Sequence, residues 1–310
     1  MKDLRIPLFP IHTYRQLLAA MFLGICFMSA AARSQTAPRP ITIAVLDFAE
    51  ANVGKLVSER FATNLASSIP LKIIDRDLAR TAARGAGYSG SLNLSLSEAR
   101  DLGAAMGCDF YFLGDAQTVR RSPSIGPPYF ESYASIFLVS TRTGRLISWE
   151  RPSFEAATPA AAEHLLLDQL TKEATRSHYL LKLEQAQEIE RHERQIAFER
   201  NLPVIPEIED ASEEGKKGDS LRSPRPYRRL KPAYPDSAAR ADAEGTVDVL
   251  VELDTTGEVS HLDLARWAGF GLDEAALNTV QQLHFFPATR GGIAIPIRVL
   301  LRYNFRKPLK

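Results

Sequence analysis

The sequence contains few cysteines and no excess of charge of either sign. Its 310 residues include two cysteines, Cys26 and Cys108. Cys26 lies in an apolar run near the N-terminus, and if that run is removed or enters a membrane, Cys108 has no partner within the chain. The fold therefore does not depend on disulfides. The net charge of +1 provides no basic field to attract nucleic acid, so we expect no nucleic-acid partner.

Motifs of catalysis and cofactor binding are also missing. The sequence has no P-loop, no His-Glu-x-x-His run and no Cys-x-x-Cys pair. The stretch GAGYSG at residues 85–90 matches the glycine pattern of dinucleotide-binding loops, but a helical pattern precedes it and a Ser/Leu-rich loop follows. This order is the reverse of the one that pyrophosphate binding requires. His261 and His284 are isolated from other ligands, so we expect no catalytic residue, no cofactor and no metal ligand.

Two aspartates leave one enzymatic alternative open. Asp47 and Asp75 each end an apolar strand pattern, and sites in α/β folds form at strand ends. Aspartates at such positions also cap turns and helices, which is the interpretation we favour. The alternative is an enzyme that uses this carboxylate pair in the first domain.

No apolar run reaches the length of an ordinary membrane span. Residues 17–32, LLAAMFLGICFMSAAA, follow a short region with Lys2, Arg5 and Arg15 and end in three alanines. A span needs about 20 apolar residues, whereas this pattern fits a secretory signal with a small-residue cleavage site. We therefore expect residues 1–32 to be a signal peptide, removed to leave a chain beginning at Arg33. A short membrane anchor is the alternative.

The pattern of residues 41–156 predicts an α/β domain. ITIAVLDF, residues 41–48, is a nearly continuous apolar run typical of a buried strand. Ser95 and Glu98 form a capping-box pattern that opens a later helix. Apolar residues at a spacing of four predict a helix that packs over the first strand, and they are Val53, Val57, Phe61, Leu65 and Ile69.

A helix and a linker are predicted next. Residues 159–200 contain no Gly or Pro after Pro159, which predicts one long helix. Its charged second half favours a solvated arm over a coiled-coil dimer, because Ile189 and Ile196 make too thin an apolar seam. Residues 201–226 carry prolines, an acidic block and a basic block without apolar periodicity, and we expect a disordered linker. Basic residues from Lys216 to Lys231 could touch an anionic surface, but we favour a solvated tether.

The last segment, residues 227–308, predicts a small α+β domain of one helix on a sheet. Val247, Val249, Val251 and Leu253 alternate with polar residues, and DTTG turns the chain into a second strand. LDEAALNTVQQL then predicts an amphipathic helix. A terminal strand at residues 295–306 alternates apolar and basic residues, so we expect it to bury one face and show a basic one to water.

Residues of the last segment are specific enough to indicate a family. They are spread in order over the segment, and they are Pro232, Tyr234, Pro235, Ala238, Ala239, Glu244, Gly245, Thr246, Val247, Asp254, Gly257, Leu272, Asp273, Ala275, Ala276, Phe285, Pro287, Ala288 and Pro296. In these residues the segment 227–308 resembles the TonB C-terminal domain. It departs from that family at Leu283, where Trp is usual, and in ARWAG, residues 265–269, which replaces Ser-Ser-Gly.

The resemblance implies a non-enzymatic role in the cell envelope. TonB domains sit in the periplasm and bind an extended segment of an outer-membrane transporter by adding it to a sheet edge, which is β-augmentation. We therefore expect an outer-membrane transporter or another envelope protein as partner. The candidate partner-binding residues lie in the Pro232–Pro235 segment, at the start of the first strand and on the terminal strand: Pro232, Tyr234, Pro235, Gly245, Val299, Leu301 and Tyr303.

Two versions of this role remain open. An energy-coupled protein needs a membrane helix to dock on ExbB and ExbD, so it requires residues 17–32 to be retained in the inner membrane. Removal of these residues leaves a passive periplasmic adaptor.

Residues 41–150 resemble the CsgG-like curli-secretion lipoproteins and the TolB N-terminal group of periplasmic α/β domains. The lipidated cysteine and the length needed for pore-forming hairpins are missing. The resemblance therefore implies a periplasmic interaction domain and not a secretion channel. The residues that carry it are residues 43–48 (IAVLDF), Ile74, Asp75, Arg76, Leu102, Gly103, Gly107, Cys108, Asp109, Leu113, Gly114, Thr143 and Gly144.

Overall fold

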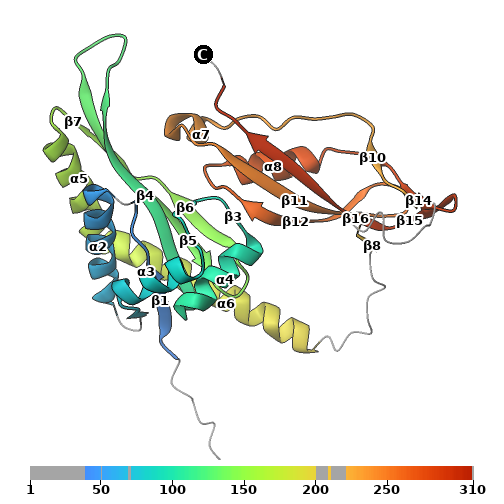
Figure 1. Ribbon diagram of the computed structural model, residues 1–310, viewed down its shortest axis with the longest axis horizontal. Helices are drawn as coiled ribbons and strands as arrows, with labels where there is room; N and C mark the ends of the chain where they lie inside the picture. Colours follow the sequence, from blue (N-terminus) through green and yellow to red (C-terminus); the bar gives the residue numbers. More distant parts are fainter. Residues whose placement is uncertain (1–38, 50, 69–70, 200–208, 211–220, 309–310) are drawn as a thin grey trace, which may run out of the picture. The chain divides into compact units, whose positions relative to one another are not determined.

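The structure is a computed structural model that describes residues 39–49, 51–68, 71–199, 209–210 and 221–308 (Figure 1). The described residues from Ile41 onward belong to one compact unit. The signal or anchor predicted at residues 1–32 lies outside the described residues, as does Ile69 of the predicted helix stripe. Among the helices of the described ranges, none is long and apolar enough to cross a membrane.

A mixed sheet forms the centre of the N-terminal part of this unit. Its order is β2-β1-β4-β5-β6, and β7 pairs with β5. β1 is parallel to β2 and β4, and the later neighbours are antiparallel. All five residues of β1 are buried, which matches its continuous apolar sequence. The strands are β1 (Ile41–Val45), β2 (Leu71–Ile73), β4 (Phe110–Arg121), β5 (Tyr129–Ser140), β6 (Leu146–Glu150) and β7 (Ser153–Ala156).

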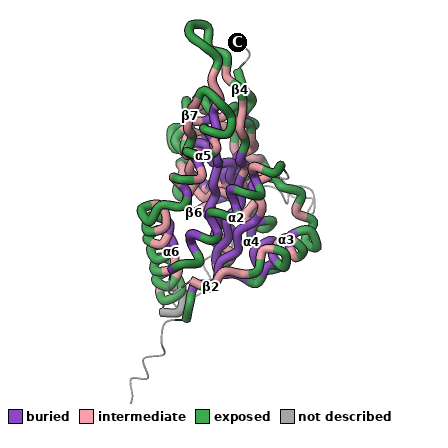
Figure 2. Tube along the Cα trace, turned by 90° about the vertical axis from the view of Figure 1, so that its left-hand side faces the viewer, coloured by how far each residue is buried: buried purple, intermediate pink, exposed green. Residues whose placement is uncertain are grey.

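Helices cover both faces of this sheet, so the predicted α/β architecture is present. α2 (Asn52–Ala66) buries Val57, Phe61 and Leu65 against one face, as its spacing predicted. α3 (Arg76–Gly85) and α4 (Leu96–Met106) pack on the other face through small and apolar residues. The capping box of Ser95 and Glu98 is present at the start of α4. The buried strands lie between the exposed helix surfaces in Figure 2.

The single helix predicted at residues 159–200 is wrong, because the chain breaks at Lys172. α5 (Pro159–Thr171) ends there with an extended backbone, and α6 (Glu173–Glu199) follows. The Asn64 side-chain amide of α2 donates to the main-chain oxygens of Leu170 (2.8 Å) and Lys172 (3.1 Å). These bonds satisfy carbonyls that the end of α5 leaves open.

The break lets α6 pack on the sheet, so the predicted solvated arm is wrong for its first half. Tyr179 and Leu183 of α6 are buried in the same core as Phe61 of α2. The ring centroids of Phe61 and Tyr179 lie 5.0 Å apart in an edge-to-face arrangement. Farther along, Ile189 is 61% exposed, and the coiled-coil alternative stays a prediction.

The C-terminal part has the helix-on-sheet architecture that its sequence predicts. β11 (Gly245–Leu253) pairs antiparallel with β12 (Val259–Trp267) and with β16 (Ile297–Phe305). α8 (Leu272–Val280) packs its buried residues Leu272, Ala276 and Val280 on this sheet. The short α7 (Asp236–Ala241) precedes β11. Figure 1 shows these elements in orange and red.

Short strands border the C-terminal sheet. β3 (Leu94–Ser95) and β8 (Glu209–Asp210) extend it, giving the order β3-β12-β11-β16-β8. β9 (Leu221–Arg222) joins β14 (Ala288–Arg290) and β15 (Ile293–Ile295), while β10 (Arg225–Pro226) pairs with β13 (Phe285–Phe286). The linker predicted at residues 201–226 is therefore ordered at residues 221–226. Residues 201–208 and 211–220 lie outside the described residues.

Candidate partner-binding surface

Each edge of the C-terminal sheet carries a two-residue strand at one end within the described part of the chain. At one edge, Leu94 and Ser95 of β3, from the N-terminal α/β part, pair antiparallel with Trp267 and Arg266 at the end of β12. At the other edge, β8 lies beside only the first two residues of β16. Because the covered end of β12 is packed on the α/β part, a binding site for an added strand is sought first at β16.

Asn93 lies at the end of β12 that β3 covers, and its side chain bonds to both β11 and β12. Its amide nitrogen Nδ2 donates to the main-chain oxygens of Thr246 (2.8 Å) and Trp267 (2.6 Å). Its Oδ1 accepts a hydrogen bond of 3.0 Å from the amide of Thr246. The main-chain oxygen of Asn93 accepts from Arg266, whose guanidinium also lies 3.1 Å from Glu98. Asn93 thus occupies the end of β11 and β12 in the way that a further strand residue would.

Trp267 attaches the C-terminal sheet to the N-terminal one. It is fully buried, its indole Nε1 donates to the main-chain oxygen of Gly144 (2.9 Å), and its ring stacks on Phe137 of β5. Gly269 approaches the same Phe137 so closely that a Cβ atom there would lie 2.5 Å from its ring. ARWAG, the departure from the family pattern, is therefore the stretch that contacts the α/β part.

β16 leaves most of its outer edge without a strand partner in the described part of the chain. It pairs with β11 along all 9 of its residues, from Ile297 opposite Leu253 to Phe305 opposite Gly245. On its other side, β8 pairs only with Ile297 and Arg298. Main-chain groups of residues 299–305 that point away from β11 can accept an added strand.

The predicted residues of the terminal strand lie on this open edge, but their side chains point inward. Val299, Leu301 and Tyr303 pack against the core, while Leu300 between them is 49% exposed. Burial raises the pKa of the Tyr303 hydroxyl. A strand added here would meet the main chain of these residues and the side chains of their neighbours. Their role in binding a partner stays a prediction.

The outer face of β16 is not the free basic face that its sequence predicts. Arg302 forms a paired contact with Asp248 of β11, through Nε to Oδ1 (2.7 Å) and Nη2 to Oδ2 (2.9 Å). Its hydrogen bond with Asp248 raises the pKa of the Arg302 guanidinium. Arg298 binds Glu252 in the same cross-strand manner. Directly opposite pairs of unlike charge stabilise a sheet, so these arginines serve the β11–β16 contact.

The other predicted binding residues have structural roles in this fold. The Tyr234 hydroxyl donates to the main-chain oxygen of Ala243 (2.6 Å), and Pro235 is the N-cap of α7. Gly245 begins β11 where a Cβ atom would lie 2.8 Å from that of Ala268. Pro232 is half-buried and lies in no strand. The structure therefore does not place the Pro232–Pro235 segment at a sheet edge.

The aspartates of the enzymatic alternative have separate partners. Asp47 accepts a hydrogen bond from Arg76 and lies 3.6 Å from Arg80. Asp75 caps α3 by accepting from the amides of Asp77 and Leu78, both at 3.0 Å. The favoured capping interpretation holds for Asp75, and Asp47 is neutralised by arginine. No group of three or more His, Cys, Asp or Glu residues that could hold a metal ion exists in the described ranges.

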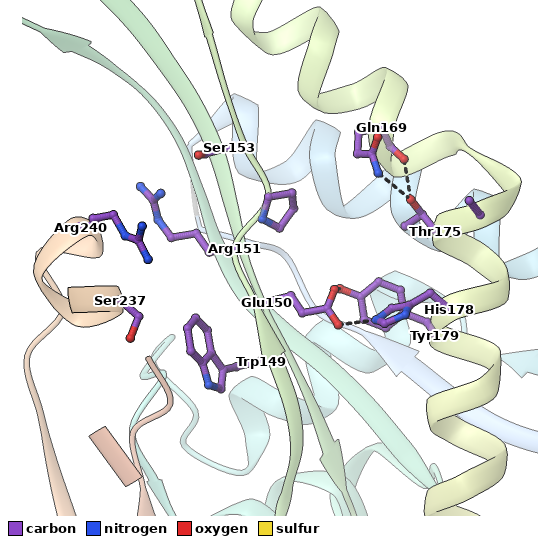
Figure 3. Close-up of a pocket in the computed structure, with 12 residues that line it drawn as sticks. Trp149, Glu150, Arg151, Ser153, Gln169, Thr175, His178, Tyr179, Ser237 and Arg240 are labelled. Carbon is purple, nitrogen blue, oxygen red and sulfur yellow. Dashed lines mark hydrogen bonds and ion pairs between the residues drawn. The ribbon is translucent and has the colours of Figure 1, made fainter. Parts of the chain in front are cut away.

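A hollow of about 700 Å³ beside β6 is lined by polar side chains of β6, α6 and α7 (Figure 3). Glu150 accepts from the Tyr179 hydroxyl (3.2 Å) and lies 2.5 Å from Nε2 of His178. Burial, and then Glu150, raise the pKa of Tyr179. The hydroxyls of Thr175 and Ser237 donate to main-chain oxygens at 2.7 Å, while His178 is paired with Glu150.

The C-terminal domain thus combines a helix-on-sheet fold with a strand, β16, whose outer edge is largely unpaired within the described residues. The sequence model described as Gram-negative bacterial TonB protein C-terminal matches residues 231–306. This match covers the predicted C-terminal domain and confirms that part of the resemblance. No curated protein matched the chain.

Several solved structures align with part of the chain. The hypothetical protein CT253 from Chlamydia trachomatis is 14% identical over 42% of this chain and 92% of its own, with a TM-score of 0.31. The TonB C-terminal domain of Pseudomonas aeruginosa is 20% identical over 28% of this chain and 89% of its own, with a TM-score of 0.25.

A third alignment is with LpoB from E. coli, 14% identical over 38% of this chain and 59% of that protein, with a TM-score of 0.27. These scores and identities are too low for any conclusion about function. None of these three structures is described as a CsgG-like or TolB protein, so the resemblance of residues 41–150 to that group stays a prediction.

Proposed function

We propose that this chain is a non-enzymatic protein of the Gram-negative cell envelope. Its C-terminal domain would bind an extended segment of another envelope protein by β-augmentation along residues 299–305 of β16. The observation that supports this proposal is the outer edge of β16, where β8 covers only Ile297 and Arg298 and residues 299–305 have no strand partner within the described residues. β12 also has a two-residue strand, β3, at one end, but that end is fixed to the α/β part through Asn93 and Trp267. The family match to residues 231–306 supports the envelope setting.

The partner class that best fits is the extended segment of an outer-membrane transporter or of another envelope protein. Main-chain pairing supplies affinity, and Leu300, which is 49% exposed, offers an apolar contact to the added strand. The periplasm is the compartment in which such a segment would be met. The α/β part would serve as an interaction domain that carries the C-terminal sheet through Asn93 and Trp267.

Energy coupling distinguishes the two versions of this function. A protein that transmits force would retain residues 17–32 in the inner membrane and dock on ExbB and ExbD. A passive adaptor would lose them. The apolar run of residues 17–32 would span about 24 Å as a helix, short of a bilayer core of about 30 Å. This deficit supports the adaptor, and the intact mass of protein taken from its native envelope tests it: retention of Met1 would restore the coupled version.

Peptides with selectively blocked donors test strand addition. We would titrate the full chain with N-terminal peptides of the host's outer-membrane transporters and follow hydrogen–deuterium exchange. Binding should slow the exchange of amides within residues 299–305. Two matched peptides, N-methylated on alternate residues in opposite phase, should then differ, because only one phase removes the donors that face β16. Equal binding by both peptides, or protection confined to the hollow beside β6, would contradict the proposal.

A further inference from the structure

A cluster of unpaired cations lies on the chain segment that enters the C-terminal domain. Residues 221–231, LRSPRPYRRLK, contain five basic residues and no acidic one. All five are exposed, and no ion pair engages any of them within the described residues. They are Arg222, Arg225, Arg228, Arg229 and Lys231. These cations differ from the arginines of β16, which are paired with carboxylates of β11.

The segment is fixed to the domain by main-chain contacts and buried apolar residues. Arg222 pairs with Thr289 of β14, and Arg225 pairs with Phe286 of β13. The amide of Tyr227 donates to the main-chain oxygen of His284 at 2.8 Å. Leu221 and Leu230 pack against the core. The cations are therefore held on a folded surface, and the solvated tether expected from sequence is wrong for residues 221–231.

Two aromatic side chains stand exposed among these cations. Tyr227 is 58% exposed and Phe286 is 54% exposed, although their ring centroids lie only 4.3 Å apart. Phe286 lies directly opposite Arg225 in the β10–β13 pairing. Large aromatic side chains that remain half-exposed to solvent are typical of interaction surfaces. Tyr227, Phe286 and the five cations together are called the Tyr227 surface.

The carboxylate of Glu258 does not neutralise the Tyr227 surface. Glu258 binds Nδ1 of His284 at 2.9 Å, and the His284 ring lies beside that of Tyr227 with centroids 6.5 Å apart. No ion pair joins Glu258 to any of the five cations. The surface therefore presents a fixed excess of positive charge around an apolar centre.

We propose that the Tyr227 surface binds the headgroup region of an anionic phospholipid bilayer. Guanidinium and ammonium groups would meet lipid phosphates, while Tyr227 and Phe286 would enter the boundary between headgroups and acyl chains, where aromatic side chains are enriched in membrane proteins. An acidic protein surface would also attract the cations. The exposed aromatic pair favours a bilayer, because acidic residues give such rings no apolar environment. This inference is independent of strand addition at β16.

Fluorescence quenching locates the surface relative to lipid. The full chain carrying Tyr227→Trp would be mixed with vesicles of phosphatidylcholine alone, or of phosphatidylglycerol and phosphatidylcholine in equal parts, with brominated acyl chains. The introduced indole should be quenched only in the anionic vesicles. Leu78→Trp on α3 is the matched control, since Leu78 is 67% exposed and lies far along the chain from the Tyr227 surface. Trp149, Trp267 and residues 17–32 are common to both variants and to the unmodified chain, whose quenching is subtracted.

Charge removal tests the electrostatic part in the Tyr227→Trp background. Each basic residue near an anionic surface changes partitioning by about fivefold. Replacing Arg225, Arg228 and Arg229 together by Gln should therefore lower partitioning, read from quenching of the introduced indole, by about 100-fold. A control with Arg60, Arg84 and Arg100 replaced by Gln loses the same charge from exposed positions on α2, α3 and α4. It should change partitioning by less than about fivefold.

Three outcomes would overturn the inference. The first is an unquenched indole in the Tyr227→Trp variant with anionic vesicles. The second is equal quenching in the Tyr227→Trp and Leu78→Trp variants, which would show attachment without this orientation. The third is an equal loss of binding in the two triple variants, which would show a response to net charge alone. Circular dichroism of each variant establishes that it is folded, so a loss of quenching reports binding.

Discussion

The indole nitrogen of Trp267 donates a hydrogen bond of 2.9 Å to the main-chain oxygen of Gly144, 123 residues earlier in the chain. The same ring stacks on Phe137, so one side chain joins the C-terminal sheet to the α/β sheet through both a polar and an apolar contact. Buried residues of both parts belong to one continuous core. The C-terminal domain is thus packed directly against the α/β part.

Trp267→Phe should destabilise the protein although it keeps most of the buried ring. The variant leaves the Gly144 carbonyl without its donor, and a buried acceptor that loses its partner costs about 1 to 3 kcal/mol. Urea unfolding measures the change in free energy. Trp149→Phe is the control, because Trp149 is only half-buried, and should change stability by about 0.5 kcal/mol. Equal stability of the two variants would show that the bond to Gly144 contributes little.

Asn93→Ala should destabilise the end of the C-terminal sheet that contacts the α/β part, where β11 begins and β12 ends. The side chain makes three hydrogen bonds to the main chain of Thr246 and Trp267, so its loss should lower the free energy of unfolding by about 2 kcal/mol. Hydrogen exchange of the Thr246 amide should accelerate. Asn304→Ala, which removes one exposed bond to Thr246, is the control. Unchanged exchange at Thr246 in Asn93→Ala would refute this role.

Gly245→Ala should be destabilising, and Ala268→Gly should rescue it. The added Cβ would lie 2.8 Å from the Cβ of Ala268, and overpacking of this kind costs about 1 to 3 kcal/mol. Removing the Ala268 methyl restores the space, so the double variant should recover at least half of the loss. Thermal denaturation of the two single variants and the double variant measures the coupling. Additive losses would mean that the two positions do not conflict.

Asp273 should make stability depend on pH in an unusual direction. Burial raises its pKa from 3.8 to about 6, although the amides of Ala268 and Gly269 donate to it and oppose the shift. A raised folded pKa means that the folded state holds the proton more tightly. The contribution of the protonated Asp273 carboxyl to the free energy of unfolding is therefore present below pH 4 and is lost as the pH rises through about 6.

The stability advantage of the native chain over Asp273→Asn should accordingly shrink between pH 4 and pH 7, by about 3 kcal/mol at most. Urea unfolding of both proteins at several pH values measures it. The comparison with the Asn variant cancels the titration of all other groups. An advantage that grows with pH would mean that the two amide donors outweigh burial and that the folded pKa is lowered.

The sequence predicted elements whose determinants lie close together in the chain. The capping box needs only Ser95 and Glu98, and the stripe of α2 needs only a spacing of four. The break at Lys172 depends on Asn64, which is 108 residues away, and no local pattern signals it. The structural role of Asn93 was missed for the same reason. In the sequence it lies in a predicted loop, and its partner Thr246 is 153 residues away. ARWAG gave the one usable signal, a departure from a family pattern.

The candidate site was predictable in kind but not in detail. The resemblance indicated strand addition and named the terminal strand. It could not show that the β16 arginines are paired, because alternation predicts which face a side chain takes and not which partner it meets. It also could not show that Tyr234 and Pro235 hold α7 and the turn after it, so a role of the Pro232–Pro235 segment in partner binding stays a prediction.

The register between β11 and β16 has a mechanical consequence. Their pairing runs over 9 residues without a bulge, whereas the β11–β12 pairing is shifted at two places. A pull along β16 would load the hydrogen bonds of the uninterrupted ladder in parallel, so they would resist it together. A pull at right angles to β16 would instead break these hydrogen bonds one after another, starting from one end. β11 would therefore hold β16 in place against a lengthwise pull on β16 better than against a pull at right angles to it.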